Sequence, residues 1–184
     1  MVLIFLGETM KASKILGVLA LCLLPANAMA ASDGTIGTTS TGTAVISVTI
    51  PKLIRARSFS DFNMSASYPG TGDLNANDDL NISTNYATAG YRLTGTGTGA
   101  SSAFTVTDGT QTIAYNAYFN DVSGTTGRVA LATGTPLTAQ TGAATTLASA
   151  TLNANLSIEM LQANLQAVNA GAYTGTITLV FTPE

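Results

Sequence analysis

Histidine is absent from the 184-residue sequence, and the only cysteine is Cys22. Without these side chains the chain cannot form a histidine-dependent catalytic triad, a His- or Cys-ligated metal site, or an activated thiol nucleophile. The carboxylates are scattered, and the adjacent pair Asp78 and Asp79 would point to opposite faces of a strand, which does not suit paired acid–base chemistry. We therefore expect a protein that is not an enzyme and that holds no metal and no cofactor.

Charged residues and tryptophan are also scarce. Only 9% of the residues are charged, tryptophan is absent, and the pI is near 4.7, so the basic footprint of a nucleic-acid-binding protein is missing. With 46% hydrophobic residues, Thr, Ser, Asn and Gly must supply most of the polar surface. That mixture disfavours helices and suits strands joined by tight turns. The length is that of a single domain.

The first thirty residues have the pattern of an export signal. Lys11 and Lys14 precede an apolar run over residues 15–24, and Ala30 ends a small-residue cleavage motif. The run is too short for a membrane-spanning helix, which needs about 20 apolar residues. We therefore predict that residues 1–30 are a signal peptide, that translation starts at Met10, and that the chain is exported to a bacterial periplasm and then to the cell surface or the medium.

Two alternatives stay open at this end of the chain. Cleavage after Ala28 would also fit the motif, and translation from Met1 would give an unusually long start. In either case Cys22 belongs to the apolar core of the signal, so the exported chain has no cysteine and no disulfide. Leu21 stands where a lipoprotein signal needs a small residue, so we expect no lipid anchor.

The strongest strand pattern lies at the end of the sequence, over residues 170–184. Apolar and aromatic side chains alternate there with threonines, and Val180 is the one apolar residue on the threonine side. The sequence ends at Glu184, so we expect the far edge of this strand to lack a partner, and an unpaired apolar edge favours pairing with another chain. The apolar face comprises Tyr173, Ile177, Leu179 and Phe181.

A second alternating stretch lies near the start of the exported chain. Residues 31–42 are polar and Gly-rich and predict a flexible segment. Residues 43–50 then predict a strand, which ends at Pro51 because proline cannot donate a ladder hydrogen bond. We therefore divide the exported chain into an extension over residues 31–50 and a domain over residues 51–184. The apolar face of the extension's strand comprises Ala44, Ile46, Val48 and Ile50.

Short strands and turns fill the rest of the chain. The pair Asp108 and Gly109 between two extended runs predicts a hairpin, because glycine accepts a positive φ at little cost. Residues 161–168 favour a loop or a short strand over a helix. Seven or eight strands at roughly 8–15-residue spacing predict an all-β sandwich. The expected strands are 53–59, 80–84, 90–94, 103–107, 110–119, 128–132 and 151–160, and the expected turns and loops are 68–79, 94–102, 121–127 and 136–144.

Three clusters are weaker candidates for a site. Residues 73–79 place oxygen ligands at alternate positions but lack the glycine and the final glutamate of a calcium loop, so we interpret them as a solvated turn. Lys52, Arg55 and Arg57 form a basic cluster that we expect on the solvent side of a strand. Three aromatic residues at close spacing are expected in core and cross-strand packing, not in a sugar-binding platform. These are Tyr115, Tyr118 and Phe119.

The two ends of the exported chain together resemble a known family. The segments TAVISVTIPKLIRARSFSDF and AGAYTGTITLVFTPE are similar to the ends of chaperone–usher pilus (fimbrial) subunits, near the cysteine-free and spore-coat-U-like branches. In that family an alternating N-terminal strand precedes a proline and the first domain strand, and the chain finishes on a strand of this kind. Many spore-coat-U-like members carry a disulfide, which this chain lacks.

The resemblance implies an immunoglobulin-like β-sandwich that is incomplete because its last strand is missing. In the family, the N-terminal strand of another subunit fills the open groove, which is a form of β-strand addition. By position, the apolar face of residues 43–50 would be the donor, and the face from Tyr173 to Phe181 would line the accepting edge. A periplasmic chaperone that holds the C-terminal carboxylate, here on Glu184, and an outer-membrane usher would be partners before assembly.

We therefore expect a secreted structural subunit that polymerises into a surface fibre by donor-strand complementation, with a role in adhesion or biofilm. Its partners would be copies of itself or related subunits. The alternative is a monomeric binding module whose own residues 43–50 fill its groove, although Pro51 and Lys52 leave little slack for such a return. A secreted hydrolase is the third and least favoured function, because histidine and cysteine are missing.

Overall fold

The structure is a computed structural model that describes residues 31–64, 68–144 and 147–184. The expected export signal over residues 1–30 lies outside these residues. The chain divides into two units, Met1–Thr49 and Ile50–Glu184. None of the helices within the described ranges combines the length and the apolar character that a membrane crossing requires.

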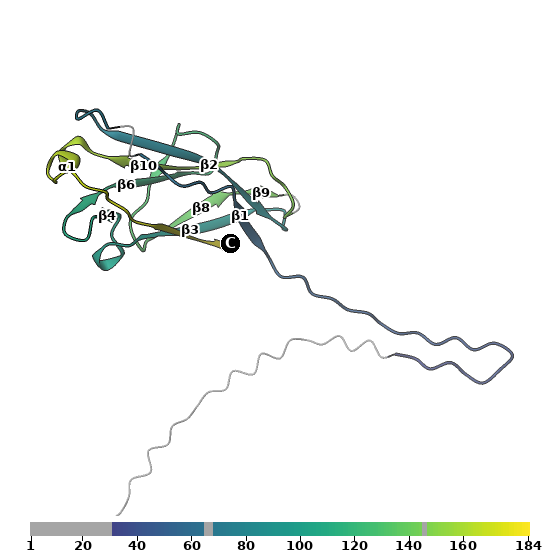
Figure 1. The fold of residues 1–184 in the computed structure, drawn as a ribbon. Coiled ribbons are helices and arrows are strands. Elements are labelled where there is room, and N and C mark those ends of the chain that lie inside the picture. Colours follow the sequence, from purple (N-terminus) through teal and green to yellow (C-terminus); the bar gives the residue numbers. More distant parts are fainter. Residues whose placement is uncertain (1–30, 65–67, 145–146) are drawn as a thin grey trace, which may run out of the picture. The chain divides into compact units, whose positions relative to one another are not determined.

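The second unit contains two main sheets, which Figure 1 shows as two layers. The larger sheet has the order β1-β2-β10-β6-β7, and β9 pairs in parallel with the end of β2. The smaller sheet has the order β11-β3-β8, and β4 and β5 form a separate hairpin. The strands of the larger sheet are β1 (Ile54–Arg57), β2 (Leu74–Thr84), β6 (Asn116–Asn120), β7 (Val129–Ala130), β9 (Ala143–Ala144) and β10 (Ala154–Met160). The others are β3 (Gly90–Gly97), β4 (Thr105–Thr107), β5 (Thr112–Ala114), β8 (Pro136–Thr141) and β11 (Ile177–Pro183).

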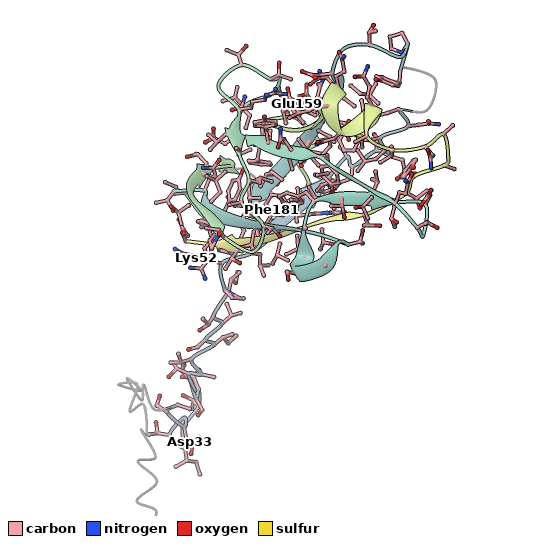
Figure 2. The ribbon with its side chains drawn as sticks, turned by 90° about the vertical axis from the view of Figure 1, so that its left-hand side faces the viewer. Asp33, Lys52, Glu159 and Phe181 are labelled. Carbon is pink, nitrogen blue, oxygen red and sulfur yellow. The ribbon has the colours of Figure 1, made fainter. Side chains whose placement is uncertain are left out.

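The core lies between the two sheets. Tyr91 on β3 and Phe119 on β6 are fully buried, with ring centroids 6.4 Å apart in an edge-to-face arrangement. Phe181 on β11 packs 5.8 Å from Tyr91 and 6.0 Å from Phe119, and Figure 2 shows it in the interior of the sandwich. Aromatic pairs at these distances add to the burial of the individual rings. This packing confirms the predicted all-β sandwich.

The order of the strands is that of an immunoglobulin-like sandwich. With β1, β2, β6 and β10 taken as strands A, B, D and E, the larger sheet has the order A-B-E-D of the constant-type fold. In the smaller sheet β11 takes the place of strand F beside β3, which takes the place of strand C. In the complete fold a strand G would pair with the outer edge of F, and no strand of the described residues does so here.

The solvated turn predicted over residues 73–79 is wrong, because β2 begins at Leu74. Asn and Asp are normally depleted in strands, but here several of the polar side chains find partners that the local sequence does not show. Asp79 Oδ1 accepts hydrogen bonds from Asn155 Nδ2 and Gly124 N, both at 2.8 Å. Asp78 Oδ2 accepts one from Ser60 N at 2.7 Å. The two adjacent carboxylates thus bind different segments.

Three other local predictions are also wrong. Residues 136–144 form β8 and β9 instead of a loop, since β8 pairs with β3 and β9 with β2. Gln162–Gln166 form a short helix, α1, where a loop or strand was favoured. The linker predicted over residues 94–102 is the second half of β3 followed by a 3₁₀ turn, η1, at Ala100–Ser102. In each case contacts with distant residues decide the local conformation.

The hairpin at Asp108 and Gly109 is confirmed. β4 and β5 pair in antiparallel register, and Gly109 has a φ of +94°. Asp108 Oδ1 accepts hydrogen bonds from the main-chain N–H groups of Thr110 (2.8 Å) and Gln111 (2.7 Å), which closes the turn. The strand predicted over residues 151–160 is confirmed as β10, although both of its faces are buried from Ala154 to Ile158.

In the described part of the first unit, residues 31–49, every residue is exposed and there is no helix. Ser32 and Thr43 form an antiparallel bridge, with main-chain hydrogen bonds of 2.9 and 3.1 Å. Beyond this bridge, residues 44–49 form no strand within the unit.

Phe119 allows a direct test of the core. Phe119→Ala should lower the free energy of unfolding by about 3–5 kcal/mol, because a fully buried ring is removed from between the sheets. Val129 lies opposite Phe119 in the β6–β7 register but is 47% exposed, so Val129→Ala should cost less than about 1 kcal/mol. Denaturant titrations measure both changes, and similar losses for the two variants would contradict the placement of Phe119.

Candidate functional site: an open sheet edge and its cleft

The outer edge of β11 is the most unusual feature of the domain. One edge pairs with β3 from Ile177 opposite Gly97 to Pro183 opposite Tyr91. No strand of the described residues pairs with the other edge. Its inward side chains nevertheless belong to the core, since Ile177, Leu179 and Phe181 all pack against the buried cluster. The edge is therefore a row of main-chain donors and acceptors bordering an apolar interior.

The segment before β11, residues 167–176, is here called the strap. It makes no regular strand, although its alternating sequence predicts one from Tyr173 onward. Thr174 pairs with Thr107 of β4 through two main-chain hydrogen bonds of 2.9 Å. Gly175 lies so close to β4 that an added Cβ would be 2.6 Å from Thr105 O. The glycine thus allows the strap to pass the hairpin.

A cleft of about 1100 Å³ lies beside the strap. The strap and Ile177 form one wall, and residues 59–64, which follow β1, contribute to the lining from another segment. The side chains that line it are mostly apolar, and Asp61 is the one charged residue among them. Apolar lining residues from other elements include Leu74, Ile113, Tyr115, Leu156, Ile158, Met160 and Leu165. The volume exceeds the usual 300–1,000 Å³ of small-molecule pockets, and no cluster of metal-ligating side chains occurs in the described parts of the chain.

The four residues predicted to line the accepting edge divide into two groups. Tyr173 and Ile177 line the cleft itself. Leu179 and Phe181 lie farther along the same face of β11 and pack into the core beneath the open edge. Ile177, Leu179 and Phe181 pack against the core from β11, whereas Tyr173 lies in the strap before it, and only Tyr173 and Ile177 border the cleft.

Tyr173 also forms a tyrosine corner, a feature of immunoglobulin-like sandwiches at the turn leading into strand F. Its hydroxyl lies 2.8 Å from Asn169 O, four residues upstream, and 3.1 Å from Gln111 Oε1 in the β4–β5 hairpin. Gln111 Oε1 also accepts a hydrogen bond from Asn169 N at 2.8 Å. Partial burial, then the nearby Asp108 charge and its hydrogen bond, raise the pKa of Tyr173. The pKa of Asp108 is lowered, chiefly by the main-chain N–H of Gln111.

The predicted donor residues are highly exposed. Ile46 is 94% exposed, Val48 is 83% exposed and Ile50 is 72% exposed, and Ala44 is exposed as well. Large aliphatic side chains at alternate positions gain free energy when they are covered.

Glu184, the predicted chaperone anchor, is held by the domain. Its N–H donates to Gly90 O at 2.9 Å, and its main-chain oxygen accepts a hydrogen bond from Lys52 Nζ at 2.6 Å. Lys52 Nζ also lies 5.0 Å from the centre of the Tyr86 ring. Of the predicted basic cluster, Lys52 and Arg55 are exposed, and Arg57 is half-buried and donates to Asn81 Oδ1 at 3.3 Å.

The aromatic residues before β7 pack as expected. Tyr115 and Phe119 are buried, and Arg128 lies 4.1 Å from the centre of the Tyr118 ring. The Tyr118 hydroxyl donates to Glu159 Oε2 at 2.7 Å, and this bond is the main reason why the pKa of Glu159 is lowered. The ring and hydroxyl of Tyr118 thus already have partners within the domain, which does not favour a sugar platform.

Sequence reasoning missed two parts of this site. The first strand was predicted to end at Phe59 and no role was predicted for residues 60–64, and only their position after β1 brings Phe62 and Met64 to the cleft. Gln111 carries no sequence signal, because its role depends on the loop that it meets. Leu165 and Val168 did have a signal, since their helical spacing marks one apolar face.

Comparison with known proteins adds one likeness of fold. No protein-family model matches the sequence, and no curated protein matches it. A solved structure of a chaperone–tip adhesin complex, described as vital for activation of CFA/I fimbriae biogenesis, contains a similar chain. The TM-score is 0.51 at 18% sequence identity, and the match covers 71% of this chain. The chain matches only 42% of the length of that neighbour, and at this identity the likeness shows the fold alone.

Gly175 tests the close approach of the strap to β4. Gly175→Ala should lower the free energy of unfolding by about 1–3 kcal/mol, because the new methyl group would press against Thr105 O and Val106. Gly90 has no atom within 4 Å of the corresponding position, so Gly90→Ala should change stability by about 0.5 kcal/mol or less. Thermal or denaturant unfolding compares the two, and equal stability of both variants would show that the strap lies elsewhere.

Proposed function

We propose that this protein is an exported structural subunit of a surface fibre, in which residues 43–50 of one copy fill the cleft beside β11 of the next. The observation that carries the proposal is the open edge of β11 over an apolar cleft. An extended strand is the occupant that satisfies both features at once, because its main chain pairs with the edge and its alternate side chains enter the cleft.

The chemistry of the donor suits the cleft. Residues 43–50 carry no charged side chain, and the cleft lining has only Asp61. An eight-residue strand spans about 26 Å at ~3.3 Å per residue, enough to run along the strap and β11. Burying Ile46 and Val48 would each contribute roughly 1.5–3 kcal/mol, and each ladder hydrogen bond about 1 kcal/mol. Such a sum is large beside the usual stability of a domain, about 5–15 kcal/mol.

Donation between copies is favoured over self-insertion by the anchoring of residues 51–53. The Asn85 side chain donates to Pro51 O at 3.0 Å and accepts from Leu53 N at 2.7 Å, as a neighbouring strand would. Asn85 N donates to Leu53 O at 3.3 Å, and Lys52 Nζ is bound to Glu184 O. For residues 43–50 to return to their own cleft, the chain would have to reverse direction within this anchored segment.

The same features support the partners and the cellular route that the sequence predicts. A cleft of this kind is prone to aggregation until it is filled, so a periplasmic chaperone and an outer-membrane usher would protect and order the subunits before assembly. The fold likeness to a chain of a chaperone–tip adhesin complex supports a fimbrial role. The subunit would serve adhesion or biofilm formation as a non-catalytic fibre component, held at the cell surface by its neighbours.

Polymerisation can be tested with the full chain exported to a bacterial periplasm. Unboiled samples on a denaturing gel should show a ladder of stable oligomers, because the filled cleft resists unfolding. Ile46→Asp combined with Val48→Asp should abolish the ladder, since both charges would enter the apolar cleft.

Ser47→Asp is the matched control, because it adds the same charge on the opposite face of the strand and should preserve the ladder. A clean monomer that unfolds reversibly in the wild type would refute strand donation and favour the self-complemented module. Loss of the ladder in Ser47→Asp as well would contradict the proposal that only the face with Ile46 and Val48 enters the cleft.

A further inference from the structure

We propose that the tyrosine corner preorganises the cleft, with Gln111 and Tyr173 as positioning residues that hold the strap ready for an incoming strand. The inference rests on the proposed function, because it assigns a role to residues beside the strand-accepting edge. Neither residue belongs to the β3-paired part of β11. Their contacts instead join the strap to the tip of the β4–β5 hairpin.

The strap has few main-chain bonds of its own. Besides the Thr174 bridge, Asn169 N donates to Gln111 Oε1, and Thr176 N makes a long contact of 3.4 Å with Thr98 Oγ1. The Tyr173 hydroxyl also donates to Asn169 O, which links two residues of the strap. One side-chain carboxamide and one hydroxyl therefore fix the five residues from Asn169 to Tyr173, which line the cleft.

Gln111 is itself firmly placed. Its N–H donates to Asp108 Oδ1 at 2.7 Å, and its carbonyl accepts hydrogen bonds from Thr107 Oγ1 at 2.8 Å and Asp108 N at 3.3 Å. Gly171 passes close to the same turn, since an added Cβ would lie 3.4 Å from Asp108 Oδ2. The hairpin tip is thus a rigid support against which the strap rests.

A held strap matters for binding because ordering a segment on association costs affinity. Each residue fixed into one backbone conformation costs free energy, and preorganised sites avoid that cost at the moment of binding. If the corner is broken, the strap must be ordered by the incoming strand itself. The loss should therefore appear mainly in strand binding, since Gln111 lies outside the buried core cluster.

The test measures binding of a fluorescent peptide with the sequence of residues 43–50. The host is the exported full chain carrying Ile46→Asp and Val48→Asp, so that its own segment does not compete. Gln111→Leu should weaken peptide binding roughly tenfold, because it removes the oxygen that accepts the Asn169 N–H hydrogen bond and that shares the Tyr173 hydroxyl proton with Asn169 O. Gln111→Glu keeps an acceptor oxygen and should restore binding. Gln140→Leu on β8, whose side chain donates only to Thr138 O among the described bonds, is the matched control and should bind as the parent does.

Amide hydrogen exchange of residues 169–175 gives the second readout. Gln111→Leu should exchange faster there, while the unfolding midpoint stays close to that of the parent. Unchanged exchange and unchanged peptide binding in Gln111→Leu would overturn the inference while leaving strand donation in place. Failure of the parent host to bind the peptide would overturn both, because a site without this occupant cannot be preorganised for it.

Discussion

The main chain of β11 has hydrogen-bonding groups along an edge that no strand of the described residues covers. The rest of the structure depends on this constraint. Burying a peptide group without a hydrogen-bond partner costs free energy, so the main chain of an edge that borders the core must be paired with a strand, covered or hydrated. Here Ile177, Leu179 and Phe181 draw the strand inward, while its outer edge lies next to a large apolar cleft. The domain therefore has a well-packed centre and one side along which no strand of the described residues pairs with β11.

The two ends of β11 are prepared differently. After the end of β11, Lys52 Nζ donates a hydrogen bond to Glu184 O, and the Asn85 side chain donates one to Pro51 O. These bonds hold residues 51 and 52, the root of the N-terminal extension, against the domain. Before the start of β11, the strap is held by the tyrosine corner and the Thr174 bridge. The first arrangement fixes the root from which the proposed donor strand begins, and the second shapes the place where another donor would enter. A fibre subunit needs both, since each copy must donate and accept.

Much of the fold could be predicted from alternation alone. The patterns over residues 151–160 and 170–184 predicted the strands β10 and β11, although β11 begins only at Ile177, and Asp108-Gly109 predicted the hairpin. The failures share one cause. The polar start of β2 is a strand because Asn155 and Gly124 satisfy Asp79, and β8 is a strand because β3 lies beside it. Such partners are distant in sequence, so local pattern carries no sign of them.

The same limit applies to the candidate site. The strand that carries the open edge was visible in the sequence, because its apolar face has a period of two. The cleft was not, because Phe62, Met64 and the strap meet only after the sandwich has formed. Gln111 is the extreme case, since a polar residue in a hairpin has many possible roles until the loop beside it is known.

The placement of residues 43–50 of one copy in the cleft of another can be measured directly, because the chain has no cysteine after Cys22. Two differently tagged copies are co-exported, one with Ile177→Cys and the other with a cysteine at a single extension position. Disulfides form only when the Cα atoms approach within about 7 Å. The account predicts mixed-tag disulfide dimers from Ile46→Cys or Val48→Cys and none from Ser47→Cys. Absence of mixed dimers, together with a cross-link inside single chains that carry both cysteines, would contradict it.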